Sequence, residues 1–289
     1  MHIGVRLGPR GWPFAELVAS WRAAEEVGFG FVSCADQLTA QEGGPTWDAP
    51  SLLAVMAAST SDIPLAIHVV NTSLRDPIVL AAQVTAAQAL SGGRVTVGLG
   101  AGPPREQRER QGTGATASPW RDRVARLDAF CRALPALWRG HAVSHSQLGL
   151  RDARLGPTGI HPPSVVVGGS SDAVLGVAAR HADVWNGIAD HLDDFAARAS
   201  RLGEIIQGVE RDHDVAVEAL VHVDAYVVGR EWDSLRAHLE RLAEMGTNRV
   251  VLSLDHERGP DAVHRLGEAV GQDRRDAGAE PRPPVEQSR

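Results

Sequence analysis

The sequence contains no lysine and little cysteine or tyrosine. All 29 basic residues are arginines, set against 36 acidic residues, and the formal net charge is −7. A negative chain without a basic run argues against a nucleic-acid partner. Only Cys34 and Cys131 occur, without a C-x-x-C spacing. The sequence therefore predicts neither a disulfide framework nor a thiolate zinc site.

Long apolar runs of the kind that cross a membrane are also missing. The first residues lack the charged segment and apolar stretch of a secretory signal peptide. We therefore expect a cytoplasmic protein without a membrane partner. Its 289 residues, 43% of them hydrophobic, suffice for a sizeable core. One α/β barrel of about 250 residues fits this length.

What the sequence does contain is a regular alternation of strand-like and helix-like segments. The strand-like segments are mostly continuous apolar runs, which is typical of parallel strands buried on both faces. Eight alternating pairs at this length predict a closed (β/α)8 TIM barrel with loop insertions, with an open doubly wound sheet as the alternative. The predicted strands are residues 3–7, 29–36, 63–71, 94–100, 164–169, 183–187, 219–228 and 249–254. The predicted helices are residues 14–27, 50–59, 76–90, 119–138, 172–181, 192–210, 232–245 and 261–269.

Two stretches, residues 38–47 and 141–159, interrupt this rhythm and are predicted to be long loops. Long loops in a compact domain are usually functional. We predict a single barrel domain over residues 1–270. The polar, proline-rich residues 271–289 are predicted to be disordered.

The segment "RVTVGLGAGPP", Arg94–Pro104, places Gly98, Gly100 and Gly102 at the end of a predicted strand. A dinucleotide-binding turn needs a helix directly after its glycines, and two prolines follow here instead. The glycines therefore mark either a tight turn or a place where the backbone approaches another group closely.

In a (β/α)8 barrel the active site lies at the carboxyl ends of the strands. The residues expected there are mostly glycines and small polar residues, which suit a large flat ligand better than hydrolase chemistry. They are Cys34, Ala35, Asp36, Gln37, His68, Val69, Val70, Asn71, Gly98, Leu99, Gly100, Ala101, Gly102, Gly168, Gly169, Ser170, Ser171, Trp185 and Asn186.

The segment from Gly168 to Asp172 joins a buried strand to a helix. Free N–H groups at a helix start, together with the helix dipole, suit a phosphate group. Asp172 is the expected N-cap. Simple capping of a barrel helix explains the same residues, and this segment alone leaves both interpretations open.

The order of these motifs resembles the bacterial-luciferase-like superfamily of flavin- and deazaflavin-dependent oxidoreductases. The stretch "RDPIVLAAQVTAAQALSGGRVTVGLGAG" matches the family's Arg-x-Pro, alanine-rich helix, S-x-G-R and G-x-G-x-G pattern. A second match is "PPSVVVGGSS…AARHADVWNG", and the resemblance extends over residues 1–270. The matching positions in the first stretch are Arg75, Pro77, Ser91, Gly93, Arg94, Gly98, Gly100 and Gly102.

The resemblance implies a site for coenzyme F420, with flavin mononucleotide (FMN) as the alternative. It implies that the glycines of the fourth strand make room beside the cofactor, and that Ser170 and Ser171 bind its phosphate. It also implies a non-proline cis peptide at His68–Val69 behind the ring, and Asn71 near the ring's polar edge. A core histidine bonded to backbone is the other interpretation of His68. The residues expected at the cofactor are His68, Val69, Val70, Asn71, Gly100, Ala101, Gly102, Gly168, Gly169, Ser170 and Ser171.

The catalytic candidates are Asp36, Gln37 and His68. Gln37 and Pro103 stand where related deazaflavin-dependent dehydrogenases carry a histidine and a glutamate, so general-base oxidation of an alcohol is disfavoured. We expect a reductase that adds hydride to a C=N or C=C bond, or an FMN-dependent monooxygenase. A flavin-binding protein without catalysis is a third possibility. Asp36 is a proton donor, a ring partner or the cap of the next helix.

The expected partners are a small-molecule substrate, a second copy of the chain, and a separate flavin reductase if the cofactor is FMN. No metal is expected. His141 and His145 have the spacing of helical metal ligands, but Gly140 and Ser144 indicate a loop, and a third ligand is lacking.

Overall fold

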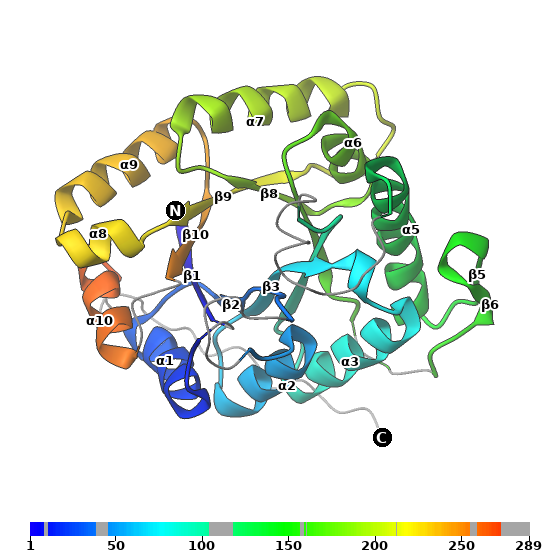
Figure 1. Cartoon of the computed structure of the whole chain (residues 1–289), viewed down its shortest axis with the longest axis horizontal. Coiled ribbons are helices and arrows are strands. Elements are labelled where there is room, and N and C mark those ends of the chain that lie inside the picture. Colours follow the sequence, from blue (N-terminus) through cyan, green and yellow to red (C-terminus); the bar gives the residue numbers. More distant parts are fainter. Residues whose placement is uncertain are drawn as a thin grey trace.

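A closed parallel barrel forms the framework of the molecule (Figure 1). The computed structural model describes residues 1–8, 11–38, 46–103, 118–156, 159, 161–211, 213–254 and 259–272. The strand order around the wall is β1-β10-β9-β8-β7-β4-β3-β2, which confirms the predicted (β/α)8 barrel over the open sheet. The barrel strands are β1 (His2–Leu7), β2 (Val32–Cys34), β3 (Leu65–Asn71), β4 (Val95–Gly100), β7 (Ser164–Gly168), β8 (Val184–Ile188), β9 (Ala216–His222) and β10 (Arg249–Leu254).

Helices surround these strands on the outside of the barrel (Figure 1). They are α1 (Phe14–Val27), α2 (Ala49–Ser59), α3 (Pro77–Leu90), α5 (Trp120–Trp138), α6 (Asp172–His181), α7 (Leu192–Ile206), α8 (Asp224–Gly229), α9 (Trp232–Glu244) and α10 (Pro260–Ala269). The 3-10 turn η1 (Thr72–Leu74) follows β3. None of the helices that the structure describes is long and apolar enough to cross a membrane.

Local chemistry sets the helix ends. Helix α1 stops at Gly28, whose φ of 95° lies in the left-handed region that glycine adopts freely. Helix α3 begins with Pro77 after Asp76, whose carboxylate accepts from the backbone N–H groups of Ile78 and Val79 at 3.0 and 3.1 Å. These signals can be read in the sequence, which is why the predicted boundaries are close to the observed ones.

Arg94, just before β4, ties together the amino-terminal end of the barrel. Its guanidinium donates to the carbonyls of Ala57 at 3.2 Å, Thr60 at 3.0 Å and Ile63 at 2.6 Å. These carbonyls belong to the end of α2 and the turn into β3. One side chain therefore satisfies backbone acceptors at the end of the helix and in the turn that follows it.

The core has two parts. The larger part lies between the strands and the helices, and a smaller cluster of Phe31, Ala66, Leu220 and Val251 is separate from it. Neighbouring residues of β10, such as Val251 and Leu252, belong to different parts because successive side chains of a strand point to opposite faces.

Two predicted segments are wrong. The strand predicted over residues 219–228 ends at His222, and the chain turns at once into helix α8, which leaves Val228 68% exposed. A short apolar run does not distinguish a strand from a helix. Residues 141–159, predicted to be a loop, contain the antiparallel hairpin of β5 (Val143–His145) and β6 (Leu150–Ala153) around the 3-10 turn η2 (Ser146–Leu148). Gly149, with a φ of 69°, makes the turn between its strands.

Other predictions fall outside the described residues. They include most of the predicted loop at 38–47 and residues 273–289 of the predicted disordered tail.

Candidate functional site

A pocket of about 820 Å³ opens at the carboxyl ends of the barrel strands. This is the size of pocket that holds a cofactor or a drug-sized molecule. The structure brings most of the predicted site residues together here. Gln37 is half-buried and does not line the pocket, and neither do Cys34, Ala35, Gly98, Leu99 and Trp185. The predicted residues that line it are Asp36, His68, Val69, Val70, Asn71, Gly100, Ala101, Gly102, Gly168, Gly169, Ser170, Ser171 and Asn186.

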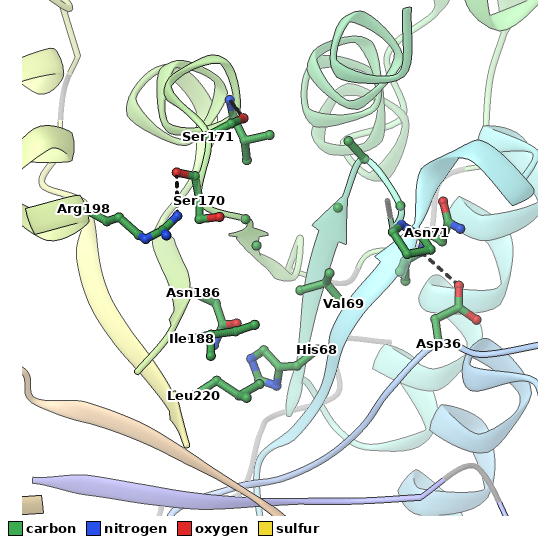
Figure 2. Close-up of a pocket in the computed structure, with 18 of the residues that line it drawn as sticks. Asp36, His68, Val69, Asn71, Ser170, Ser171, Asn186, Ile188, Arg198 and Leu220 are labelled. Atoms are coloured by element: carbon green, nitrogen blue, oxygen red, sulfur yellow. Dashed lines mark hydrogen bonds between the residues drawn. The ribbon is translucent and has the colours of Figure 1, made fainter. Parts of the chain in front are cut away.

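The floor of the pocket is built around Val69. The peptide bond His68–Val69 is cis, as predicted, and the register between β3 and β4 shifts between Ile67 and Val70. The side chain of Val69 stands in the middle of the pocket in Figure 2. It offers a half-buried apolar surface to a ligand.

The glycines at the ends of β4 and β7 make room for Val69. A Cβ atom on Gly98, Gly100 or Gly168 would lie 2.7, 2.7 or 2.8 Å from the nearest Val69 methyl carbon. These are distances that packed atoms do not reach. The resemblance predicts that the glycines of β4 make room beside a cofactor. In the structure Gly100 faces this valine first, and Gly98 faces both the valine and the carbonyl oxygen of Ile67. They therefore shape the pocket through Val69.

The side chain of Asp36 is fully buried and positions one end of the pocket. Its carboxylate accepts from the backbone N–H of Asn71 at 3.0 Å and from Arg75 Nε at 3.1 Å, and Arg75 Nη2 pairs with its second oxygen. Arg75 also pairs with Asp48, the residue that caps α2. Of the alternatives considered for Asp36, capping of the next helix is therefore wrong. Burial lowers the pKa of Arg75, but the two carboxylates raise it by more. The net shift is upward, and the guanidinium stays charged.

A buried ionic cluster lies beneath the floor. His68 Nε2 is 3.0 Å from Glu218 Oε1, at ion-pair distance but poorly aligned for a hydrogen bond, and both side chains are fully buried. Glu218 also accepts from Asn186 Nδ2 at 3.0 Å and pairs with Arg249 at 3.1 Å. Burial raises the pKa of Glu218, but His68, Arg249 and Asn186 lower it by more, so the net shift is downward.

His68 thus faces a carboxylate instead of the backbone acceptor considered from the sequence. Its Nδ1 meets no hydrogen-bond partner within the described part of the chain. Glu218 was missed because its role depends on strands β3 and β9 being opposed in space. The sequence does contain a sign of Glu218, however, because "VAVEALVHV" places one carboxylate inside a mostly apolar strand.

The start of α6 forms the opposite side of the pocket from Asn71 (Figure 2). The N-cap is Ser171, whose Oγ accepts from the N–H of Val174 at 3.4 Å, so the prediction of Asp172 as the cap is wrong by one residue. The backbone N–H groups of Ser170 and Ser171 meet no acceptor among the residues that the structure describes. Arg198 reaches over from α7 and donates to the carbonyl of Ser170 at 3.1 Å. Free amides and a guanidinium together suit an anion.

The rim beside β9 carries a further pair that sequence reasoning missed. His222 Nδ1 is 2.8 Å from Asp190 Oδ2, and Arg6 Nη2 lies 3.5 Å from His222 Nε2. All three residues line the pocket. No motif marks them, because they come from β1, β9 and the loop after β8.

Two weaker candidates lie outside this site. Trp185 is fully buried, donates from Nε1 to the carbonyl of Gly169 at 2.7 Å and stacks on Phe195. It therefore packs the barrel. His145 belongs to strand β5, and the described residues contain no group of three potential metal ligands.

The fold and the site define a (β/α)8 barrel with a ligand pocket at the carboxyl ends of its strands, the place where enzymes of this fold carry their active sites. A family model described as luciferase-like monooxygenase matches residues 1–281, and the chain belongs to this family. The resemblance noted in the sequence is thereby confirmed.

Relatives of the chain include an F420-dependent enzyme. The F420-dependent hydroxymycolic acid dehydrogenase of Mycobacterium tuberculosis is 30% identical over 217 residues, which cover 70% of this chain and 58% of the relative. The chain spans little more than half the length of the curated relatives it matches.

Solved structures support the fold alone. The F420-dependent tetrahydromethanopterin reductase of Methanopyrus kandleri superposes with a TM-score of 0.75 at 15% identity, covering 93% of this chain and 97% of the other. The EDTA monooxygenase of Chelativorans sp. BNC1 gives 0.66 at 14% identity, covering 93% and 92%.

Proposed function

We propose that this protein is an oxidoreductase that binds coenzyme F420 in the pocket and transfers hydride to or from a small organic substrate. The favoured direction is reduction of a C=N or C=C bond. The observation that carries the proposal is the layout of the pocket. The apolar side chain of Val69 lies between the start of α6, at Ser170 and Ser171, on one side and Asn71 on the other (Figure 2).

The helix start fits the cofactor's phosphate. The N–H groups of Ser170 and Ser171 are free to donate, and Arg198 adds a positive charge beside them. Gly169 lets the backbone pass close to the helix here, because a Cβ atom at this position would lie 2.9 Å from Val174 Cγ1. A phosphate at this point would receive hydrogen bonds and a favourable helix dipole.

The ring of the cofactor would lie against Val69, with Asn71 at its polar edge. Asn71 is held from both sides, because its N–H donates to Asp36 and its Oδ1 accepts from the N–H of Ser73 at 3.1 Å. A Cβ atom on Gly102 would lie 2.5 Å from Asn71 Oδ1, so this glycine keeps the amide in place. The bound cofactor supplies the hydride chemistry, and these residues bind and orient it.

The choice of F420 is supported by the F420-dependent relative at 30% identity. An FMN-dependent monooxygenase is the second candidate, because the family model bears the name of monooxygenases and a monooxygenase shares the fold. That alternative requires a flavin reductase as partner. We further propose that residues 1–270 act as one domain, and that the protein works in the cytoplasm as a homodimer on a small-molecule substrate.

The proposal is tested by titrating the cofactor-free protein with F420 and with FMN, each oxidised and reduced, and following fluorescence. We expect tight binding of F420 and weak binding of FMN. The reverse order would favour the monooxygenase, and binding of neither would refute the proposal.

Replacement of Ser171 tests the phosphate site. Ser171→Pro removes one N–H donor at a φ of −81° that proline adopts, whereas Ser171→Ala removes only the side-chain cap. A hydrogen bond to a charged group contributes about 1.5–3 kcal/mol, so Ser171→Pro should weaken F420 binding by about 10-fold or more relative to Ser171→Ala. Equal affinities of the two variants would contradict the assignment.

A further inference from the structure

The rim of the pocket beside β9 holds a histidine–aspartate pair that cofactor binding leaves unused. The side chain of His222 is 38% exposed, and its Nδ1 lies 2.8 Å from Asp190 Oδ2. The backbone N–H of His222 donates to Oδ1 of the same carboxylate at 2.9 Å. A carboxylate only accepts hydrogen bonds, so Nδ1 carries the proton and Nε2 is left to exchange one.

Asp190 is suited to hold this tautomer. Burial raises the pKa of its carboxyl group, but the two hydrogen bonds from His222 and the charge of His222 lower it by more. The carboxylate is therefore ionised at neutral pH. An ionised carboxylate behind an imidazole orients the ring and stabilises the imidazolium when it forms.

Arg6 approaches the same point from β1. Its Nε donates to Ser253 Oγ at 2.9 Å, its Nη1 lies 3.4 Å from the carbonyl oxygen of His68, and its Nη2 is 3.5 Å from His222 Nε2. The guanidinium is thus anchored on one side and directed toward the imidazole on the other. A substrate heteroatom beside both groups would receive a hydrogen bond from Arg6 and exchange a proton with His222.

Other titratable groups of the pocket are less suited to this task. The carboxylate of Asp36 is fully buried and occupied by Arg75 and a backbone amide. The side chain of His68 is fully buried. The ring of His191 is exposed and makes no hydrogen bond with the described residues. His222 combines an accessible nitrogen with an orienting carboxylate.

We propose that His222, oriented by Asp190, is the catalytic acid–base group of this pocket and that with Arg6 it binds the polar end of the substrate. The substrate class is an imine, or an alkene conjugated to a carbonyl. This inference rests on the proposed function and deepens it.

The proton balance of a reduction follows from this arrangement. The substrate carbon receives hydride, with both electrons, from the reduced cofactor, and the C=N or C=C π bond breaks. In the imidazolium form of His222, which carries a proton on both nitrogens, the Nε2 proton moves to the substrate nitrogen or, for the conjugated alkene, to the carbonyl oxygen, and this leaves the Nδ1–H tautomer. Solvent returns a proton to Nε2 and takes up the one released when the cofactor is oxidised, while Asp190 stays ionised.

The experiment compares hydride acceptors that differ in their need for a proton. 1-Pyrroline and cyclohexenone form strongly basic products unless a proton arrives with the hydride, whereas menadione forms a stable hydroquinone anion. For His222→Gln we expect a loss of about 100-fold or more in kcat with 1-pyrroline or cyclohexenone. With menadione the loss should be much smaller, and F420 affinity should be unchanged. Asp190→Asn keeps an acceptor for the backbone N–H and should fall between His222→Gln and the wild type.

A matched control is available in the described structure. His213 pairs with Asp183 at 3.2 Å and does not line the pocket, so His213→Gln should leave all three rates unchanged. An equal loss with all acceptors in His222→Gln, at an unchanged melting temperature, would overturn the proposal. Reduction of menadione alone by the wild type would overturn the substrate class.

A second measurement needs no cofactor. In the cofactor-free protein labelled with ¹⁵N, the His222 resonances should show the Nδ1–H tautomer, and Asp190→Asn should abolish this preference. An Nε2–H tautomer in the wild type would overturn the assigned pair. Failure to bind either F420 or FMN would instead refute the proposed function. The tautomer of His222 is measured without cofactor and would not be affected by that failure.

Discussion

Replacement of Gly100 by alanine tests whether the floor of the pocket is set by packing against Val69. The new Cβ atom would lie 2.7 Å from Val69 Cγ2, and its next neighbour, the carbonyl oxygen of Gly168, is 3.7 Å away. The clash is therefore with a side chain. Overpacking of this kind costs about 1–3 kcal/mol. In a domain of this size we expect Gly100→Ala to lower Tm by roughly 2–10 °C.

Val69→Ala should relieve this clash. The single substitution removes two methyl groups from a half-buried position and costs about 1 kcal/mol. The double variant Val69→Ala/Gly100→Ala should then be more stable than the sum of the two single effects by about 1 kcal/mol or more.

Gly98→Ala is the control for this pair. Its Cβ atom would overlap the carbonyl oxygen of Ile67, which is backbone, and would also lie 2.7 Å from Val69 Cγ1. Val69→Ala should therefore fail to rescue Gly98→Ala. Urea unfolding followed by the fluorescence of the seven tryptophans gives all the free energies needed. Additive effects of Val69→Ala and Gly100→Ala would refute the reasoning, and so would equal rescue of Gly98→Ala.

Two further predictions concern buried charge and pH. Glu218→Ala leaves Arg249, His68 and Asn186 without their shared partner and should lower the free energy of unfolding by about 3–5 kcal/mol. Glu218→Gln should lower it by less. An unchanged Tm in Glu218→Ala would show that the cluster contributes nothing to stability. The pKa of Glu25 lies below its usual 4.5, because hydrogen bonds from three backbone N–H groups outweigh the opposing effect of burial. Its stabilisation is therefore present above pH 4.5 and lost as the pH falls through the lower, folded-state pKa. Urea midpoints between pH 2 and 7 should show a shallower acid decline for Glu25→Gln, and no change for the exposed control Glu26→Gln.

The barrel could be predicted from the sequence because its signals are local. Apolar runs, helix caps such as Asp76 and the glycine that ends α1 act within a few residues. The prediction failed where the local signal was ambiguous. The run "ALVHVDAYVV" has the composition of a strand throughout. Its pairing with β10 ends at His222, however, and the second half of the run forms α8. The β5–β6 hairpin is short and largely polar, so no periodicity revealed it.

The candidate site was predicted on the side that the family motifs cover. Val69, Asn71 and Ser171 follow recognisable segments, and they line the pocket. The other side was missed because it is assembled from distant strands. His222 and Asp190 are 32 residues apart, and Arg6 lies 216 residues from His222, so only the closure of the barrel brings them together.

Arg94 and Arg75 belong to the sequence motif by which the family is recognised. Arg94 donates to backbone carbonyls at the amino-terminal end of the barrel, and Arg75 pairs with two carboxylates. Every guanidinium nitrogen of both side chains contacts a protein oxygen. These two residues of the family motif thus stabilise the barrel and one end of the pocket, and their contacts do not specify a substrate. The proposed substrate contacts of His222 and Arg6 lie outside that motif, so recognising the family leaves the substrate open.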